Sequence, residues 1–380
     1  MKLYKNYPIA SDRMGMLWAL NGIHDACIIE FGPAGTTHFS IEGLMQFGAT
    51  VHAKTFTTHM DEHDVTFGNE ERLVDAILEV DKVEKPAYIF VLGSSITSII
   101  GIDLEGVRLQ VQDDIDSQII LLPDCDFQRN FRQGIEEVNT ILVREIALKN
   151  STQDKQPVFN LLGLGIHDYN HRSDYYEIKR LMWEYFSLDI GTTFTLDTSI
   201  EAIAQASKAM INLVVNKEGL EAAKILEVVY KQPYVDMRPY GVANTRHWLA
   251  CIGEQLNRAV PDDICQEELK EIAYKENMLK RRIKQLEHAD IYVNQDTMDT
   301  SALEAYLSSL GFQLTDNKDN ACLVWTNGIE ALTSKKAIQI SHPSFHQERQ
   351  YPYTPMMGIR GTHYLLQEIG NTLTKALLQD

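Results

Sequence analysis

The chain is 380 residues long, with 44% hydrophobic and 23% charged residues, a composition typical of a globular protein of two or three domains. Its net charge of −18 argues against nucleic acid or an anionic membrane as the main partner, because both are bound by basic surfaces. The first residues lack the apolar core of a signal peptide, and no apolar run approaches the ~18 residues of a membrane span, so we expect a cytoplasmic protein.

The first domain is predicted over residues 1–150, where strand-like and helix-like patterns alternate after an extended arm at 1–10. Continuous apolar runs are typical of buried parallel strands, and they lie at 26–32, 87–93 and 118–124. Helical patterns separate these runs, at 11–25, 40–49, 69–85, 95–114 and 131–150. Ser40 and Asn69 are the expected N-caps of two of these helices. The polar stretch 151–157 is the expected linker.

The second domain is predicted over residues 157–258 and repeats the same alternation. Strands are expected at 158–164, 192–197, 210–216 and 233–237. Helices are expected at 173–189, 198–209, 218–232 and 247–259. Ser173 is the expected N-cap of the first of these helices.

The third domain is predicted over residues 259–380 and opens with a long charged helix at 265–289, which we expect to lie across the other domains. Three short strands follow, at 289–293, 321–325 and 337–341. Two further helices are expected, one at 301–311 that ends at Gly311 and one from 362 to about 378.

The alternation of strands and helices indicates parallel sheets with right-handed crossovers. The predicted fold class is therefore α/β, with three Rossmann-like parallel-sheet units arranged around an interdomain cleft.

Small residues follow two of the predicted strands. The first turn contains Gly32, Pro33, Gly35 and Thr36, and the second contains Gly93, Ser94 and Ser95. Ligands of open α/β sheets bind at the carboxyl ends of strands. Two interpretations stay open. The N–H and hydroxyl groups could form a polar pocket or anion nest, or the small residues could serve only the close packing of a strand-to-helix turn.

The five cysteines are scattered and form no C-x-x-C pair, which predicts free thiols in a reducing compartment. Cys27 and Cys322 lie in apolar runs and are expected in the core. Cys125 directly follows a predicted strand, and it is the one candidate for an exposed or ligand-facing thiol.

Residues 59–63 match an inverted zinc-protease pattern, H-x-x-E-H, which would use His59, Glu62 and His63. Zinc would require both imidazoles on one helix face and a third ligand. The segment lies between a strand-like run and Gly68, so a solvated loop is the competing interpretation. The sequence predicts no metal site on this chain.

Several segments together resemble the nitrogenase component 1 family, which includes the cluster-bearing subunits of nitrogenase, related cofactor scaffolds and dark-operative protochlorophyllide reductase. The matching positions are Gly15, Gly22-Ile23, the Gly32-Pro33-x-Gly35 turn, residues 60–77, Ile100-Gly101-x-Asp103 and residues 355–369. The resemblance runs over nearly the whole chain and implies the same plan of three units in a compact form.

The chain departs from this family at three positions. The resemblance implies that three cysteines hold an iron–sulfur cluster, and those positions are Ser11, Thr36 and Ser95 here. Iron–sulfur clusters are held by thiolates, and hydroxyls are poor substitutes for them. The degenerate cluster site is therefore predicted at Ser11, Gly35, Thr36, Ser94 and Ser95, with no cofactor firmly assigned to this chain.

The resemblance also implies a second cofactor site, at which nitrogenase uses one cysteine and one histidine. The cysteine position falls near Asn216, and the histidine position near Glu348, with His346 close by. A nitrogenase-type metal cofactor is therefore not expected. The candidates to face an interdomain cleft are Asn216, Arg246, His247, His346, Arg360 and His363, although such residues often only satisfy helix ends.

Members of the resembling family assemble as paired homologous subunits with the cluster at their interface, so that one side can lose ligands if the other compensates. The resemblance thus implies an oxidoreductase subunit, the cluster-poor partner in a heteromeric reductase. A homologous cysteine-bearing subunit would supply the iron–sulfur cluster at the interface, and an ATP-dependent iron–sulfur reductase would supply electrons. The alternative is a non-catalytic scaffold or a small-molecule or tetrapyrrole-binding protein of the same fold.

Overall fold

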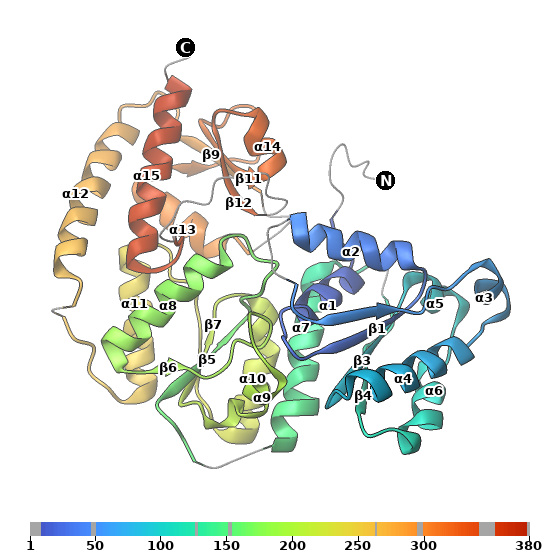
Figure 1. The fold of residues 1–380 in the computed structure, drawn as a ribbon. Coiled ribbons are helices and arrows are strands. Elements are labelled where there is room, and N and C mark those ends of the chain that lie inside the picture. Colours follow the sequence, from blue (N-terminus) through green and yellow to red (C-terminus); the bar gives the residue numbers. More distant parts are fainter. Residues whose placement is uncertain are drawn as a thin grey trace.

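The computed structural model describes residues 9–46, 51–125, 128–150, 154–262, 264–294, 299–341 and 354–377. Within these residues the strands form three four-stranded sheets, and every strand pair is parallel. Helices separate the sheets from one another and from solvent (Figure 1). The predicted α/β class with three parallel-sheet units is confirmed. The predicted domain boundaries stay predictions.

The first sheet has the strand order β2-β1-β3-β4. Its strands are β1 (Cys27–Phe31), β2 (Lys54–Thr57), β3 (Tyr88–Gly93) and β4 (Gln118–Leu121). Helices α1 (Asp12–Leu20) and α7 (Phe131–Leu142) cover one face, and α4 (Glu71–Glu84) and α6 (Leu104–Val111) cover the other. Because side chains alternate along a strand, Ile28 packs into the first of these layers and Ile29 into the second. A sheet covered on both faces explains the continuous apolar runs.

The second sheet has the order β6-β5-β7-β8. Its strands are β5 (Val158–Leu162), β6 (Asp189–Ile190), β7 (Ile211–Val214) and β8 (Tyr234–Asp236). The helices of this unit are α8 (His171–Phe186), α9 (Ile200–Ala204), α10 (Leu220–Tyr230) and α11 (Gly241–Leu256). The strand predicted at 192–197 is wrong, because this stretch makes only an isolated bridge, between Thr195 and Gly165.

The third sheet has the order β10-β9-β11-β12. Its strands are β9 (Asp290–Val293), β10 (Gln313–Leu314), β11 (Leu323–Asn327) and β12 (Ala337–Ser341), and the two-residue β10 had not been predicted. The helices are α12 (Gln266–Ile283), α13 (Ser301–Leu310), α14 (Gly328–Thr333) and α15 (Gly358–Leu377). The long α12 lies beside α15 at the edge of the molecule (Figure 1).

The apolar cores do not follow the three sheets. One core contains Met16 and Ile135 of the first unit together with Val214 and Leu226 of the second. A larger core joins the second and third units and also contains Trp18 of α1. The first helix therefore stabilises contacts between units as well as its own sheet.

Helices α1 and α7 approach so closely that side chains are excluded between them. A Cβ on Gly15 would lie 2.0 Å from the carbonyl oxygen of Phe131, and one on Gly134 would lie 1.9 Å from that of Asp12. Both positions therefore require glycine. This contact holds the N-terminus of α1 against the N-terminus of α7.

Two helix boundaries near the predicted turns differ from the sequence-based expectation. Helix α2 (Ala34–Gln46) begins well before Ser40, so Gly35 and Thr36 lie in its first turn. The predicted helix 95–114 is two helices, α5 (Ser95–Ile100) and α6, because Gly101 adopts φ +72° and ends the first of them.

Two predicted N-caps are also wrong. Asn69 does not cap α4; its amide donates a 2.9 Å hydrogen bond to Asp64 in α3 (Glu62–Phe67). Ser173 lies inside α8, which begins at His171. In both cases the helix begins at a residue other than the one that the local capping pattern indicates. None of the helices that the structure describes is long and apolar enough to cross a membrane.

Candidate functional site

The candidate site begins at the end of β1, where Glu30 is fully buried. The Thr36 hydroxyl donates to the carbonyl of Pro33 at 2.8 Å and lies 3.1 Å from a carboxylate oxygen of Glu30. This hydroxyl ties the first turn of α2 back to the strand. Thr36 is therefore engaged within its own turn.

The turn after β3 contacts the turn after β1. The Ser94 N–H donates to the carbonyl of Phe31 at 3.0 Å, and a Cβ on Gly32 would lie 2.4 Å from the Ser94 Cβ. Ser94 is also the N-cap of α5, since its hydroxyl accepts from the Thr97 N–H. The two predicted small-residue turns thus pack directly on each other, at the carboxyl edge of the sheet.

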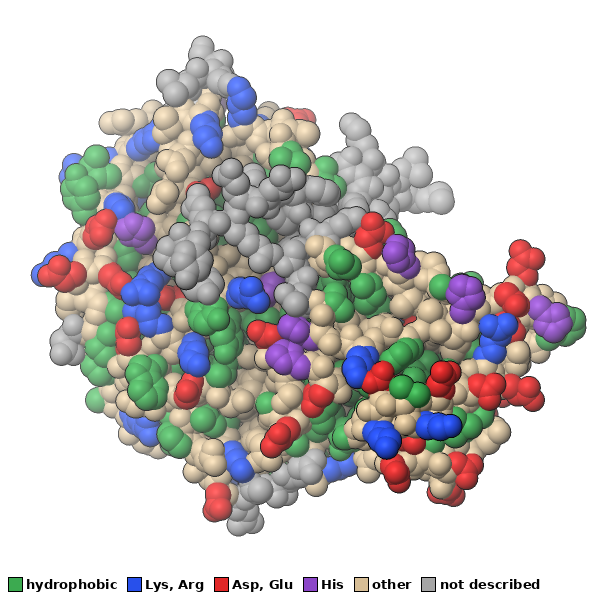
Figure 2. All heavy atoms as spheres, viewed as in Figure 1, with side chains coloured by type: hydrophobic (Ala, Val, Ile, Leu, Met, Phe, Trp, Pro, Cys, Tyr) green, Lys and Arg blue, Asp and Glu red, His purple; other side chains and the backbone are tan. Residues whose placement is uncertain are grey.

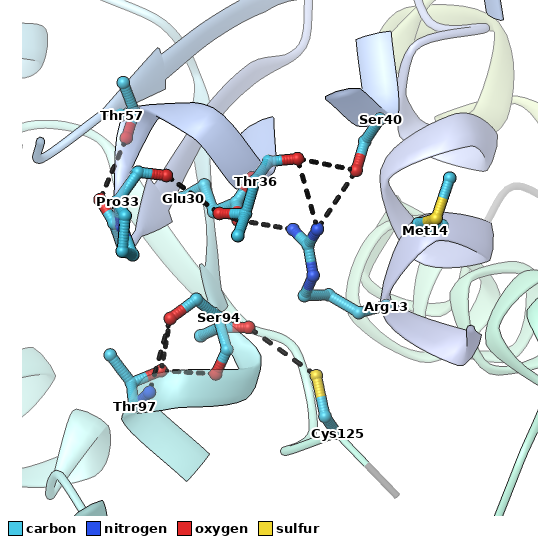
Figure 3. A network of polar contacts seen from close by, with 12 residues as sticks. Arg13, Met14, Glu30, Pro33, Thr36, Ser40, Thr57, Ser94, Thr97 and Cys125 are labelled. Atoms are coloured by element: carbon cyan, nitrogen blue, oxygen red, sulfur yellow. Dashed lines mark hydrogen bonds and ion pairs between the residues drawn. The ribbon is translucent and has the colours of Figure 1, made fainter. Parts of the chain in front are cut away.

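Helix α1 supplies the third segment of the site. Ser11 is its N-cap and accepts from the Met14 N–H. From the same turn, the Arg13 guanidinium forms a buried ion pair with Glu30 and donates to the Ser40 hydroxyl at 3.0 Å. Figure 3 shows Arg13 reaching from α1 towards Glu30, Thr36 and Ser40. The segments that carry Ser11 and Thr36 are therefore joined through Arg13.

Cys125 is the thiol of this region, and it lies beside the turn after β3, with its sulfur 3.8 Å from the Gly93 carbonyl oxygen (Figure 3). Its backbone N–H donates to the Ser98 hydroxyl at 3.2 Å. Burial raises the pKa of the Cys125 thiol, and the negative charge of Asp12 adds to that shift. Arg13 and the hydroxyls of Ser98 and Ser95 oppose it. The side chain is half-buried, so it is less accessible than its place after a strand suggested.

These residues do not fit an iron–sulfur cluster held by this chain. Such clusters take thiolate ligands, but the three expected ligand positions carry hydroxyls. Ser11 and Thr36 use their hydroxyls in bonds to their own helix and turn. The guanidinium of Arg13, paired with Glu30, lies among these segments. This ion pair links α1 to β1. Its two charges neutralise each other close to the positions where the resemblance implies cofactor ligands.

Arg13 and Glu30 had not been predicted as site residues. Glu30 is the one charged residue of the strand 27–31, and Arg13 follows Asp12 at the start of the otherwise apolar helix 12–20. A charge in a buried strand must have a partner, because an unpaired buried charge is very costly. That signal was present in the sequence, but it does not identify the partner.

Asn216 lies in a second buried polar cluster, after β7. Its amide donates to the Gly163 carbonyl at 2.7 Å, and its oxygen accepts from Arg238 at 2.7 Å. Asp168 lies 3.3 Å from the same amide. Arg238 is 8% exposed, so this cluster is closed to bulk solvent.

The other cleft candidates do not gather around Asn216 in the part of the chain that the structure describes. Arg246 and His247 are exposed on α11. Arg360 pairs with Glu268 of α12 at 3.1 Å, and the His363 ring lies 2.7 Å from the Lys275 amine. These last two contacts join α15 to α12. His346 lies outside the described residues.

The inverted zinc pattern does not assemble into a ligand set. His59 precedes α3 with φ +54°, and its carbonyl accepts from Arg72. Asp61 caps the helix, Glu62 is its first residue, and His63 is the second. Among the described residues, these three side chains do not form a group with converging ligand atoms.

Comparison with known proteins supplies the context for this site. Residues 11–315 match the family model described as nitrogenase component 1 type oxidoreductase. A nitrogenase iron-molybdenum cofactor biosynthesis protein NifE from Clostridium pasteurianum is 28% identical over 240 residues, which are 62% of this chain and 51% of that protein. A subunit of light-independent protochlorophyllide reductase from Picosynechococcus is 25% identical over 252 residues, 64% of this chain and 49% of that protein.

The chain spans about half the length of the curated relatives that it matches. Among solved structures, nitrogenase Cp1 at pH 6.5 superposes with a TM-score of 0.79 at 18% identity, covering 100% of this chain and 95% of that one. This likeness concerns the fold. The family model covers most of the chain, and so the protein belongs to the nitrogenase component 1 type oxidoreductase family.

Proposed function

We propose that this chain is the cluster-poor subunit of a heteromeric, nitrogenase-like reductase. The observation that carries the proposal is the Arg13–Glu30 ion pair, which joins the start of α1 to the turn of Thr36, where the expected ligand positions Ser11 and Thr36 carry hydroxyls. A chain that keeps this architecture without thiolates serves as one wall of an interface. It positions a partner while the partner supplies the redox group.

The proposed partner is a homologous, cysteine-bearing subunit, and the proposed electron donor to the complex is an ATP-dependent iron–sulfur reductase. Support comes from the relatives, one of which is named as a subunit of a light-independent protochlorophyllide reductase. The net charge of −18 supports a protein partner over nucleic acid. We place this complex in the cytoplasm.

Co-expression tests the proposal. The chain is produced with a cysteine-bearing homologue under anaerobic conditions, and the purified material is assayed for association, iron content and visible absorption. We expect a complex that contains iron, while the chain purified alone lacks stoichiometric iron. Failure of the two chains to associate would contradict the proposal, as would stoichiometric iron on the lone chain.

Two matched surface variants sharpen this experiment. Ile99 on α5 is 71% exposed beside the candidate site, and Val228 on α10 is 68% exposed in the second unit. If the turns face the partner, Ile99→Asp should weaken association, because it places a charge in an apolar contact. Val228→Asp should leave association unchanged. Equal effects of the two variants would argue against this face.

The alternative is a non-catalytic scaffold that binds a small organic molecule, such as a tetrapyrrole. It is favoured by the missing thiols and by relatives named as cofactor biosynthesis proteins. Titration of the lone chain with a metal-free porphyrin, followed by the shift of its visible absorption, tests this version. Saturable porphyrin binding without association to a cysteine-bearing homologue would favour the scaffold over the reductase subunit.

A further inference from the structure

Two histidines and one aspartate from distant parts of the chain converge at the junction of the first and second units. His24 follows α1, His52 precedes β2, and Asp197 lies between β6 and α9. One oxygen of Asp197 lies 2.7 Å from the Nε2 atom of His24 and 2.9 Å from that of His52. The three ligand atoms all lie within 4.8 Å of one another, and this is the one such group of three among the described residues.

We propose that His24, His52 and Asp197 form a binding site for a divalent transition-metal ion, with Zn²⁺ as the expected occupant. Two imidazole nitrogens and one carboxylate oxygen are a ligand set that zinc accepts, with water completing the tetrahedron. Ligand atoms of a tetrahedral zinc site lie about 3.3 Å apart, given metal–ligand distances near 2.0–2.1 Å. Small side-chain movements would bring the three atoms to that spacing.

The backbone holds the three ligands in place independently of their side chains. The His24 N–H donates to the Thr198 carbonyl at 2.8 Å, and the Thr198 N–H donates back to the Gly22 carbonyl at 3.1 Å. The His52 N–H donates to the Asn21 carbonyl at 3.2 Å. All three segments are therefore anchored on the turn that follows α1. An ordered backbone reduces the entropy that metal binding would otherwise cost.

Two further features fix Asp197. The next turn is tied down by the carboxylate of Asp25, which accepts from the Ile200 N–H at 2.8 Å. Asp197 itself adopts φ +52°, a left-handed conformation that aspartate tolerates better than most residues. The conformation belongs to a defined turn and presents the carboxylate to both rings.

The site is open to solvent on one side. The side chains of His24 and Asp197 are 49% and 48% exposed, and that of His52 is 22% exposed. Figure 2 shows histidine side chains gathered beside acidic ones near the middle of the visible face. An ion can therefore enter without unfolding and retain water ligands. Because the ligands come from two units, the bound ion would cross-link them.

Arg172 opposes binding. It lies at the start of α8, and its positive charge acts on both His52 and Asp197. A fixed cation near a site disfavours a divalent ion by electrostatic repulsion. We therefore expect moderate affinity in the natural chain and tighter binding after Arg172→Ala. A non-specific surface site elsewhere would not respond to this substitution.

The experiment is equilibrium dialysis of the metal-stripped, reduced full chain against Zn²⁺ near neutral pH. We expect one ion per chain, with affinity reduced at least about tenfold in His52→Ala and in Asp197→Asn. Asparagine keeps the left-handed conformation, so Asp197→Asn separates ligation from folding. Zn²⁺ should also raise the unfolding temperature of the natural chain and not that of these variants.

Two controls identify the ligands. His63→Ala should bind as the natural chain does, which would also exclude the inverted zinc pattern. His247 and Cys251 are a competing pair of possible ligands, because the His247 ring lies 3.9 Å from the Cys251 sulfur. If the proposed site is correct, His247→Ala should also bind as the natural chain does. Co²⁺ can replace Zn²⁺ as a spectroscopic probe. Its complex with the chain should lack the intense near-ultraviolet bands of thiolate ligation, because the proposed site contains no cysteine. Unchanged affinity in both His52→Ala and Asp197→Asn, or absence of binding by the natural chain, would overturn the proposal.

Discussion

Arg13 in the first turn of α1 forms a buried ion pair with Glu30 in β1, 17 positions further along the chain. The second oxygen of Glu30 has no hydrogen-bond partner in the described residues. The positive charge of Arg13 therefore compensates the buried negative charge of Glu30. Removing either partner leaves an uncompensated charge in a closed environment.

Arg13→Met should destabilise the protein by about 3–5 kcal/mol, because Glu30 is left buried and unpaired. The measurement is urea unfolding followed by circular dichroism. The double variant Arg13→Met/Glu30→Gln should recover part of the loss, since it removes both charges. Lys224→Met is the control: the Lys224–Glu221 pair is 45% and 50% exposed, so its loss should cost less than about 1 kcal/mol. Similar losses of stability in Arg13→Met and Lys224→Met would contradict this account.

Gly15→Ala should destabilise by at least about 2 kcal/mol, because the added Cβ would meet the Phe131 carbonyl and force α1 away from α7. Gly35→Ala is the matched control in α2, where a Cβ meets nothing within 4 Å. Alanine favours helix, so this variant should be neutral or more stable by up to about 1 kcal/mol. Thermal unfolding of both variants checks the prediction, which would be wrong if Gly15→Ala were neutral.

Asp174→Asn should change how stability depends on pH. Burial raises the pKa of Asp174 from its usual 3.8 to about 6, although it accepts N–H groups from Met357 and Met356. Between these two pH values the folded chain retains a proton that the unfolded chain releases, so this group lowers stability as pH rises. Above about pH 6 its contribution is constant.

Asparagine can accept the same two N–H groups and carries no titrating proton. The stability of Asp174→Asn relative to the natural chain should therefore rise by on the order of 3 kcal/mol across this window and then level off. Urea unfolding at a series of pH values measures this difference. Asp75→Asn, on the exposed face of α4, is the control variant. A difference that does not vary with pH would refute the assignment.

Cys125 should react slowly with iodoacetamide near neutral pH, because burial raises the pKa of its thiol and the thiolate is the reactive form. The rate should increase with pH, but the increase should occur at a higher pH than for an ordinary thiol, because the pKa of Cys125 is raised. Mass spectrometry of peptides after brief labelling gives the rate at each cysteine, and the urea-unfolded chain gives the reference. If Cys125 reacted equally fast in folded and unfolded chains, it would be an open, ligand-facing thiol after all.

The sequence alone located the strands that form the centres of the three sheets. Apolar runs such as those of β1, β3 and β7 must be buried on both faces, and this requirement is local to each run. It also located the two small-residue turns, because a tight turn after a strand requires small residues such as glycine and serine whatever the rest of the fold. The resemblance added the expectation of missing thiols at Ser11, Thr36 and Ser95, which follows from residue identity.

Only the tertiary structure decided which side chains meet. Arg13 pairs with Glu30, and His24 meets Asp197 from 173 positions away, because helix packing and strand order bring those segments together. The predicted caps Asn69 and Ser173 were wrong for a more local reason. The Asn69 amide bonds to Asp64 of the preceding short helix, and α8 begins two residues before Ser173, so a capping preference of about 1 kcal/mol did not set either boundary. Local patterns fix what each segment can form, and long-range packing fixes what its side chains contact.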